Sequence, residues 1–144
     1  MAPHGISCRL SVAPTAVRVW GTINGRSFWI VVDTGSERTF VREDLVNARA
    51  VPEAEQLLCG VTGECVTMRG PVEMNIGVGG VMERMPVFLA ALEDPCLLGI
   101  DFLTRVGACV AFPERKLRVR DREVPLMLGG DAPVEGSDQQ KHMA

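Results

Sequence analysis

A run of large apolar residues ends abruptly at an acidic residue in the first part of the chain. Residues 28–32 (Phe-Trp-Ile-Val-Val) are aromatic or β-branched, which predicts a strand buried on both faces. Asp33 follows directly, and a carboxylate beside a buried strand is costly unless hydrogen-bond partners hold it. Thr34 and Gly35 can supply such partners, because the hydroxyl bonds backbone groups and glycine lets the chain turn tightly. These residues are also common in ordinary turns, so the tripeptide by itself leaves a plain strand and turn open.

The segment before this run predicts the first arm of a β-hairpin. Residues 17–22 alternate between apolar or small side chains and larger or polar ones, and a second β-run begins at Ser27. Between them lies Asn24-Gly25, a strong hairpin signal because both turn positions need a positive φ. We therefore expect Asp33 to follow the second arm of a hairpin.

A second motif lies further along the chain and carries a family resemblance. Residues 97–103 read Leu-Leu-Gly-Ile-Asp-Phe-Leu, which is two aliphatics, a glycine, any residue, an acid and then apolar residues. The two motifs at this separation resemble one subunit of the retroviral-type aspartic proteases, the retropepsins, over roughly residues 17–119. The similarity is greatest to gypsy-type retroelement proteases and their domesticated versions. It implies an all-β, retropepsin-like acid protease barrel with one short C-terminal helix, assembled as a homodimer.

The chemistry that this resemblance implies needs two carboxylates sharing one proton. Like charges in contact cannot both ionise, so one carboxyl acts as a base on water while the other donates a hydrogen bond to the scissile carbonyl. The chain has one Asp-Thr-Gly, so the resemblance implies catalytic roles for Asp33, Thr34 and Gly35, with the second aspartate from another copy related by C2 symmetry. We assign Asp101 to helix capping and dipole stabilisation instead.

The resemblance also implies a cleft for an extended peptide, which would add as a strand. The residues expected to line it are Val31, Ser36, Glu37, Phe40, Gly60, Val61, Thr62, Gly63, Pro95 and Leu97. The four that run from Gly60 to Gly63 belong to a hairpin predicted over residues 57–66, which we interpret as a mobile flap, with a plain surface hairpin as the alternative. Glu37 stands where retropepsins carry an aspartate that binds substrate backbone.

Ser36 leaves two roles open. Its hydroxyl could donate to the ionised dyad, directly or through Thr34, which would lower the pKa of the pair, so that Ser36→Ala would move the active pH window upward. The alternative is an ordinary turn bond to local backbone.

The rest of the chain suits one domain. We expect an N-terminal segment at residues 1–14, the protease domain at 15–128 and a disordered tail at 129–144, where Gly, Pro, Ser and Gln accumulate. Antiparallel arms are expected at residues 68–78 and 82–90, a short helix at 101–106 and strands from 108 onward. The terminal strands around residues 117–128, with the N-terminal strand as a further candidate, are expected to form part of the dimer interface.

Composition bears on nucleic-acid binding, membrane insertion, metal binding and the state of the cysteines. The net charge of −3 does not favour nucleic-acid binding, and no apolar run is long enough to span a bilayer. Both histidines lie near the chain ends, so neither a histidine triad nor a histidine-rich metal site is expected, and no cofactor is expected. The five cysteines predict reduced thiols, with a Cys59–Cys65 bridge as the alternative. Residues 1–9 lack signal-peptide order, which favours the cytoplasm or a virus-like particle.

Together these features predict an aspartic endopeptidase that acts as a homodimer on peptides or a polyprotein. One alternative is a catalytically silent retropepsin-like module for dimerisation or peptide binding. The other is an unrelated small β-barrel with a chance Asp-Thr-Gly.

Overall fold

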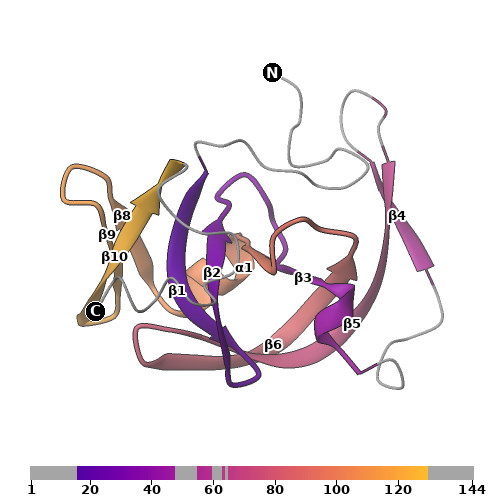
Figure 1. Ribbon diagram of the computed structural model, residues 1–144, viewed down its shortest axis with the longest axis horizontal. Helices are drawn as coiled ribbons and strands as arrows, with labels where there is room; N and C mark the ends of the chain where they lie inside the picture. The colour runs from indigo at the N-terminus through magenta and orange to yellow at the C-terminus, as the bar shows by residue number, and fades with distance from the viewer. Residues whose placement is uncertain (1–15, 48–54, 60–62, 64, 130–144) are drawn as a thin grey trace.

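The computed structural model describes residues 16–47, 55–59, 63 and 65–129, and these are mostly β-strand (Figure 1). The strands are β1 (Val17–Ile23), β2 (Arg26–Val32), β3 (Phe40–Arg42), β4 (Glu55–Cys59), β5 (Cys65–Val78), β6 (Val81–Ala90), β7 (Cys96–Leu98), β8 (Ala108–Ala111), β9 (Lys116–Val119) and β10 (Arg122–Leu128). The described part also holds a 3-10 turn, η2 (Glu43–Leu45), and one short helix, α1 (Ile100–Arg105). The all-β class with a short C-terminal helix is therefore confirmed. The expected segment 1–14 and residues 130–144 lie outside the described residues.

The hairpin that carries the acidic motif forms as the sequence predicts. Strands β1 and β2 pair antiparallel from Arg18↔Val31 to Ile23↔Arg26. Asn24 and Gly25 have φ values of 48° and 87°, the positive values that this two-residue turn requires.

Strand β1 closes the sheet into a barrel because it has three neighbours. Its residues 18–23 pair with β2, its first half pairs with β10, and its second half pairs with β5. The strands β5, β6, β3, β7, β2 and β1 thus form a closed ring, from which β4 extends on one side and β10, β9 and β8 on the other (Figure 1).

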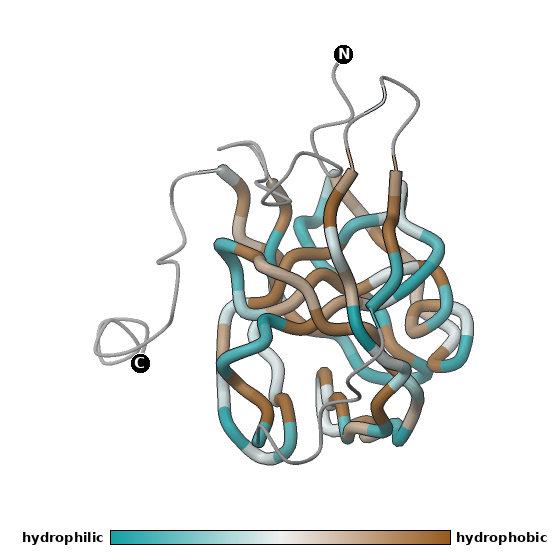
Figure 2. Tube along the Cα trace, turned by 90° about the vertical axis from the view of Figure 1, so that its right-hand side faces the viewer, coloured by the Kyte–Doolittle hydropathy of each residue, from teal (hydrophilic) through white to brown (hydrophobic). Residues whose placement is uncertain are grey.

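Two apolar cores lie on opposite faces of the strand that leads into Asp33. Phe28 and Ile30 belong to the main core, which α1 closes with Phe102. Val31 faces a second, smaller cluster, which we call the floor cluster: Val31, Phe40, Val66, Phe88, Ala90, Leu92 and Leu97. Figure 2 shows the apolar segments crossing the middle of the molecule, while many peripheral turns are hydrophilic. The expectation that β2 is buried on both faces is confirmed, since four consecutive residues of it are buried.

The terminal strands expected at the dimer interface have their backbone groups paired within the chain, so any contact they make with another copy would use side chains. Strand β10 lies between β1 and β9, and β9 lies between β10 and β8, so their backbone groups already pair within the chain. Among the described strands of this sheet end, β8 is the edge. An edge strand offers unpaired N–H and C=O groups to another chain.

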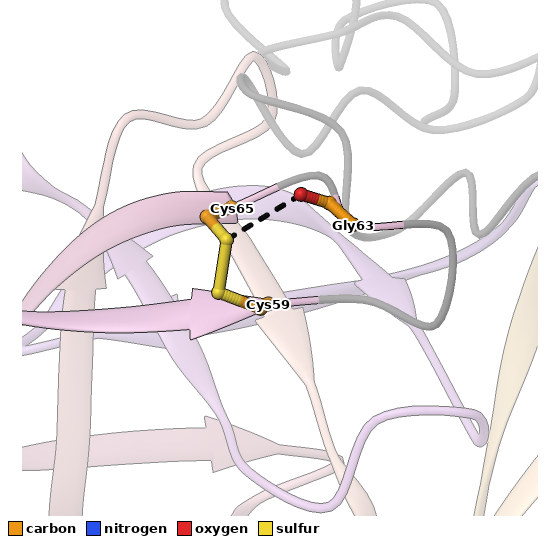
Figure 3. Close-up of a disulfide and its surroundings, with 3 residues drawn as sticks. All are labelled: Cys59, Gly63 and Cys65. Atoms are coloured by element: carbon orange, nitrogen blue, oxygen red, sulfur yellow. Dashed lines mark hydrogen bonds between the residues drawn. A yellow bond between two sulfur atoms is a disulfide. The ribbon is translucent and has the colours of Figure 1, made fainter.

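The structure corrects the expectation that all cysteines are reduced. Cys59 and Cys65 form a disulfide across the β4–β5 hairpin, where they are directly paired (Figure 3). The Gly63 carbonyl oxygen lies 3.6 Å from the Cys65 sulfur (Figure 3). Antiparallel pairing brings the two Cβ atoms close, which is why the bridge can form. Cys96 and Cys109 are free.

We expect this disulfide to control opening of the hairpin. A cross-link over so short a loop contributes on the order of 2 kcal/mol by restricting the open state. Replacing both Cys59 and Cys65 by serine should therefore speed amide hydrogen exchange in β4 by more than about tenfold. Cys109→Ser, which changes an exposed free thiol, is the control. Equal protection of β4 in the two variants would contradict this role.

Candidate active site

Asp33 leaves the end of β2 with its backbone and side chain both held. Strand β2 runs parallel to β7, and the Asp33 N–H extends this pairing by donating to the Leu98 carbonyl at 2.9 Å. One carboxylate oxygen of Asp33 accepts a hydrogen bond from the Gly35 N–H at 3.1 Å. Asp33 is half-buried, and Thr34 and Gly35 are exposed. The three predicted catalytic residues thus form a tight turn that presents a carboxylate at the surface.

The loop after Asp33 lies against the start of α1. The Ser36 carbonyl accepts the Ile100 N–H at 2.8 Å, and the Glu37 carbonyl accepts the Asp101 N–H at 3.3 Å. A Cβ on Gly99 would overlap the backbone carbonyl of Arg38. Gly99 is therefore the residue that permits this close approach.

Asp101 serves the start of the helix, as we assigned, and also holds the loop through Thr39. The N-cap residue itself is Gly99, but Asp101 lies in the first turn, where a negative charge favours the helix dipole, and its carboxylate accepts the Phe102 N–H at 2.7 Å. Its carboxylate accepts the Thr39 hydroxyl at 2.7 Å and the Thr39 N–H at 3.1 Å. The same hydroxyl oxygen accepts the Gly99 N–H at 3.0 Å, and Thr39 is fully buried. Sequence reasoning did not identify Thr39, because its partners lie about sixty residues away.

Ser36 takes the turn role rather than the dyad role. Its hydroxyl donates to the Arg38 carbonyl at 2.7 Å. That bond uses the proton that donation to Asp33 would need. In this structure the Ser36 hydroxyl therefore does not donate to Asp33, and the physical reason for the expected upward shift of the active pH window in Ser36→Ala is missing.

Several predicted cleft residues come together in the floor cluster. Val31, Phe40 and Leu97 are neighbours on β2, β3 and β7, and each is at most 3% exposed. Val66 joins them from the β4–β5 hairpin, and Leu58 packs against the same cluster. The described strands of the predicted flap hairpin thus pack on the floor cluster through these two residues.

The other predicted cleft residues do not belong to the floor cluster. Pro95 is buried just before β7, where its carbonyl accepts the Arg42 N–H at 2.9 Å. Glu37 is exposed on the loop, and Gly63 is exposed with a φ of 91°. Gly60, Val61 and Thr62 lie outside the described residues.

A buried ion pair that sequence reasoning did not identify fixes the segment before β7. The Arg18 guanidinium donates to Asp94 at 3.2 and 3.3 Å, and both residues are nearly inaccessible. Arg18 lies opposite Val31 in the β1–β2 pairing, so the pair borders the floor cluster. Breaking a buried pair leaves an uncompensated charge, which is strongly destabilising. The ion pair therefore holds the segment before β7 in place.

Three further features of the described residues concern a buried thiol, potential metal ligands and the helix. Burial raises the pKa of the Cys96 thiol far above its ordinary value, and the nearby Asp101 carboxylate raises it further, so this thiol stays protonated. Among residues 16–129, outside the gaps, no group of three His, Cys, Asp or Glu side chains could hold a metal ion. The described helix is too short to cross a membrane.

Thr39→Val should destabilise the protein by about 1–3 kcal/mol, because a buried N–H and a carboxylate oxygen lose their partner while the side-chain shape is kept. The measurement is urea unfolding followed by circular dichroism. Thr67→Val makes the same change at an exposed position on β5 and should stay within about 0.5 kcal/mol of wild type. Similar unfolding midpoints for both variants would refute the bracing role of Thr39.

Comparisons with known proteins agree with this geometry. A family model described as aspartyl protease matches residues 19–102, which is more than half of the chain. The chain is 25% identical over 126 residues to DNA damage-inducible protein 1 of Neurospora crassa, and 27% identical over 126 residues to the UBA domain-containing protein Mud1 of Schizosaccharomyces pombe. Each match covers 77% of this chain but only 26% and 35% of the respective relatives, so the chain spans about a third or less of their length.

A solved structure gives the same fold. The retroviral protease-like domain of Ddi1 from Leishmania major superposes with a TM-score of 0.58 at 19% identity, covering 82% of this chain and 98% of that domain. At this identity the match speaks for the fold, which is the one that the two sequence motifs predict. With the family match over both motifs, the chain belongs to the aspartyl protease family and has a retropepsin-like fold.

Proposed function

We propose that this protein is an aspartic endopeptidase of retroviral type that works as a homodimer. The observation that carries the proposal is the Asp33 turn: a half-exposed carboxylate, held by the Gly35 N–H at 3.1 Å, in a chain with one Asp-Thr-Gly. One carboxylate cannot be acid and base in the same step. A second copy related by C2 symmetry would supply the other Asp33.

The reaction follows from the two carboxyl groups sharing one proton. The ionised carboxylate takes a proton from a water molecule as the water oxygen attacks the scissile carbonyl carbon. The protonated carboxyl donates to the carbonyl oxygen, and a tetrahedral gem-diol forms. A proton then passes to the amide nitrogen, the C–N bond breaks, and the products are a carboxylic acid and an amine. Close contact splits the pKa values of the pair, which lets it run both roles at one pH.

The surface beside Thr34 supports the dimer. A cavity of about 400 Å³ lies between the Thr34 turn, α1 and β8. Ile100 and Phe112 are 43% and 58% exposed at the start of α1 and just after β8. An apolar rim, a cavity and an unpaired strand edge next to an incomplete site form a surface suited to self-association. We therefore propose that this face contributes to the interface; the expected contribution of residues 117–128 stays a prediction.

The substrate would be a peptide or polyprotein segment in extended form. It would lie across the exposed Asp33 turn at the end of β2, next to the β4–β5 hairpin. The hairpin would act as the flap, and Glu37 would accept a substrate backbone N–H. Location in the cytoplasm or in a virus-like particle stays a prediction.

Asp33→Asn should abolish peptide cleavage, with a loss of at least about a thousandfold in kcat/KM, because the amide cannot act as the base. The change is nearly isosteric, so the fold should persist. Asp121→Asn alters an exposed turn carboxylate and should leave the rate unchanged. Cleavage by the Asp33→Asn protein within tenfold of wild type would exclude a dyad mechanism.

Specific activity should fall on dilution below the dimer dissociation constant, because each chain carries half a site. Phe112→Glu should raise that constant by more than about tenfold, since it buries a charge in the proposed interface. Met82→Glu is the control, because Met82 is similarly exposed, at 55%, on β6. Sedimentation velocity alongside the activity assay measures both effects. A fully active monomer, or equal effects of the two variants, would contradict the proposed interface.

A further inference from the structure

Strand β1 changes its neighbour at Trp20, and a cavity lies at this place. Residues Val17–Val19 pair with β10 and residues Gly21–Ile23 pair with β5, so Trp20 pairs with β2 alone. The cavity, which we call the tryptophan cavity, has a volume of about 700 Å³. Besides Thr22 and glycines of β1, β5 and the turn after β5, its walls are formed by Trp20, Trp29, Val81, Met82, Val124 and Pro125. None of these residues belongs to the Asp33 loop or to the floor cluster, so the cavity is separate from the candidate active site.

The walls of the tryptophan cavity are apolar and come from three parts of the sheet. The rings of Trp20 and Trp29 meet edge to face, with centroids 5.2 Å apart, on the paired strands β1 and β2. The turn between β5 and β6 lies beside β10 (Figure 1), where a Cβ on Gly79 would be 3.6 Å from the Val124 side chain. None of the described residues that line the cavity carries a charge. Size and lining therefore suit a small organic molecule with an apolar body.

An arginine without a carboxylate partner lies at the edge of this cavity. A Cβ on Gly80, one of the lining glycines, would come within 3.0 Å of a guanidinium nitrogen of Arg122. The guanidinium therefore lies against the backbone of the cavity wall. Arg122 is exposed, and no ion pair joins it to a carboxylate in the described part of the chain. On the neighbouring strand β9, in contrast, Arg118 reaches Glu123 at 3.2 Å.

The indole N–H of Trp29 is a further polar group of the lining that lacks a partner. Its nitrogen is covered, and none of the described residues accepts a hydrogen bond from it. Covered donors are rarely left unbonded, because the loss of hydration is not compensated. An acceptor atom brought by a ligand would remove this cost once the ring turns toward it.

We propose that the tryptophan cavity is a second binding site, for a carboxylate with an apolar body such as a medium-chain fatty acid. The apolar chain would lie against the tryptophan, valine and methionine walls. The carboxylate would bind the Arg122 guanidinium, whose planar fork can donate two parallel hydrogen bonds. The inference does not depend on the proposed protease function, because the site contains no residue of the Asp33 turn.

The test measures binding by NMR, with octanoate as the probe and octan-1-ol as its uncharged twin. The chain has two tryptophans, both in the cavity walls, so two indole N–H signals report on the site, and Trp20→Phe assigns them. Octanoate should shift both signals saturably and bind about threefold more tightly than octan-1-ol, as expected for a partly exposed ion pair. Hexanoate should bind about tenfold more weakly than octanoate, because it buries two fewer methylene groups.

Two arginine variants separate Arg122 from general charge effects. Arg122→Gln should reduce the affinity for octanoate to that for octan-1-ol and leave the affinity for octan-1-ol unchanged. Arg118→Gln removes the same charge from an exposed arginine on β9 and should keep the preference for octanoate. Asp33→Asn should bind octanoate as tightly as wild type, which distinguishes this site from the candidate active site.

Three results would overturn the inference. The first is the absence of a saturable shift of the indole signals at about 10 mM octanoate, a concentration that reveals even millimolar affinity. The second is equal affinity of the wild-type protein for octanoate and octan-1-ol. The third is loss of the octanoate preference in both arginine variants. Because no step of the test involves cleavage, failure of the protease proposal would leave these results unchanged.

Discussion

The architecture of the site depends on the close approach of two backbone segments at Gly99. Because this position carries no side chain, the loop from Asp33 to Arg38 can rest on the start of α1 and form hydrogen bonds with it. Thr39 and Asp101 then hold the loop in place. The Thr39 hydroxyl and N–H both donate to the Asp101 carboxylate, and the hydroxyl oxygen accepts the Gly99 N–H. These contacts, together with the Gly35 N–H that bonds the carboxylate, hold the Asp33 turn within a single chain.

The same fastening also positions the strand after the loop. Thr39 leads into β3, and its carbonyl receives the Phe88 N–H, so the floor cluster is assembled from the same anchor as the carboxylate. On the other side, the buried pair of Arg18 and Asp94 fixes the segment that enters β7. The floor is thus held at both edges by polar contacts, and apolar packing fills the middle.

Local patterns predicted the parts of the structure that depend on neighbouring residues. Asn24-Gly25 predicted the hairpin, and the apolar run before Asp33 predicted a strand buried on both faces, because turn geometry and periodicity act over a few residues. The two motifs together predicted the fold. Contacts between distant positions were not predictable in this way: the sequence does not indicate that Asp101 bonds Thr39.

Two other features, the disulfide and the free edge of the sheet, also depend on contacts between distant residues. The Cys59–Cys65 bridge depends on the exact hairpin register, which places the two cysteines directly opposite each other. Likewise, the order of the last three strands decides which edge is free, and that order is a property of the whole sheet. A composition argument about thiols, or a count of strands along the chain, cannot resolve either feature.

The stoichiometry of inhibitor binding tests the central claim, that each chain carries half of an active site, most directly. The ligand is a peptide in which a hydroxyl-bearing carbon replaces the scissile carbonyl, so that it resembles the tetrahedral intermediate and is not cleaved. Isothermal titration calorimetry of the wild-type protein, above the dimer dissociation constant, gives the number bound per chain. We predict one ligand per two chains. A ratio of one ligand per chain would contradict the account.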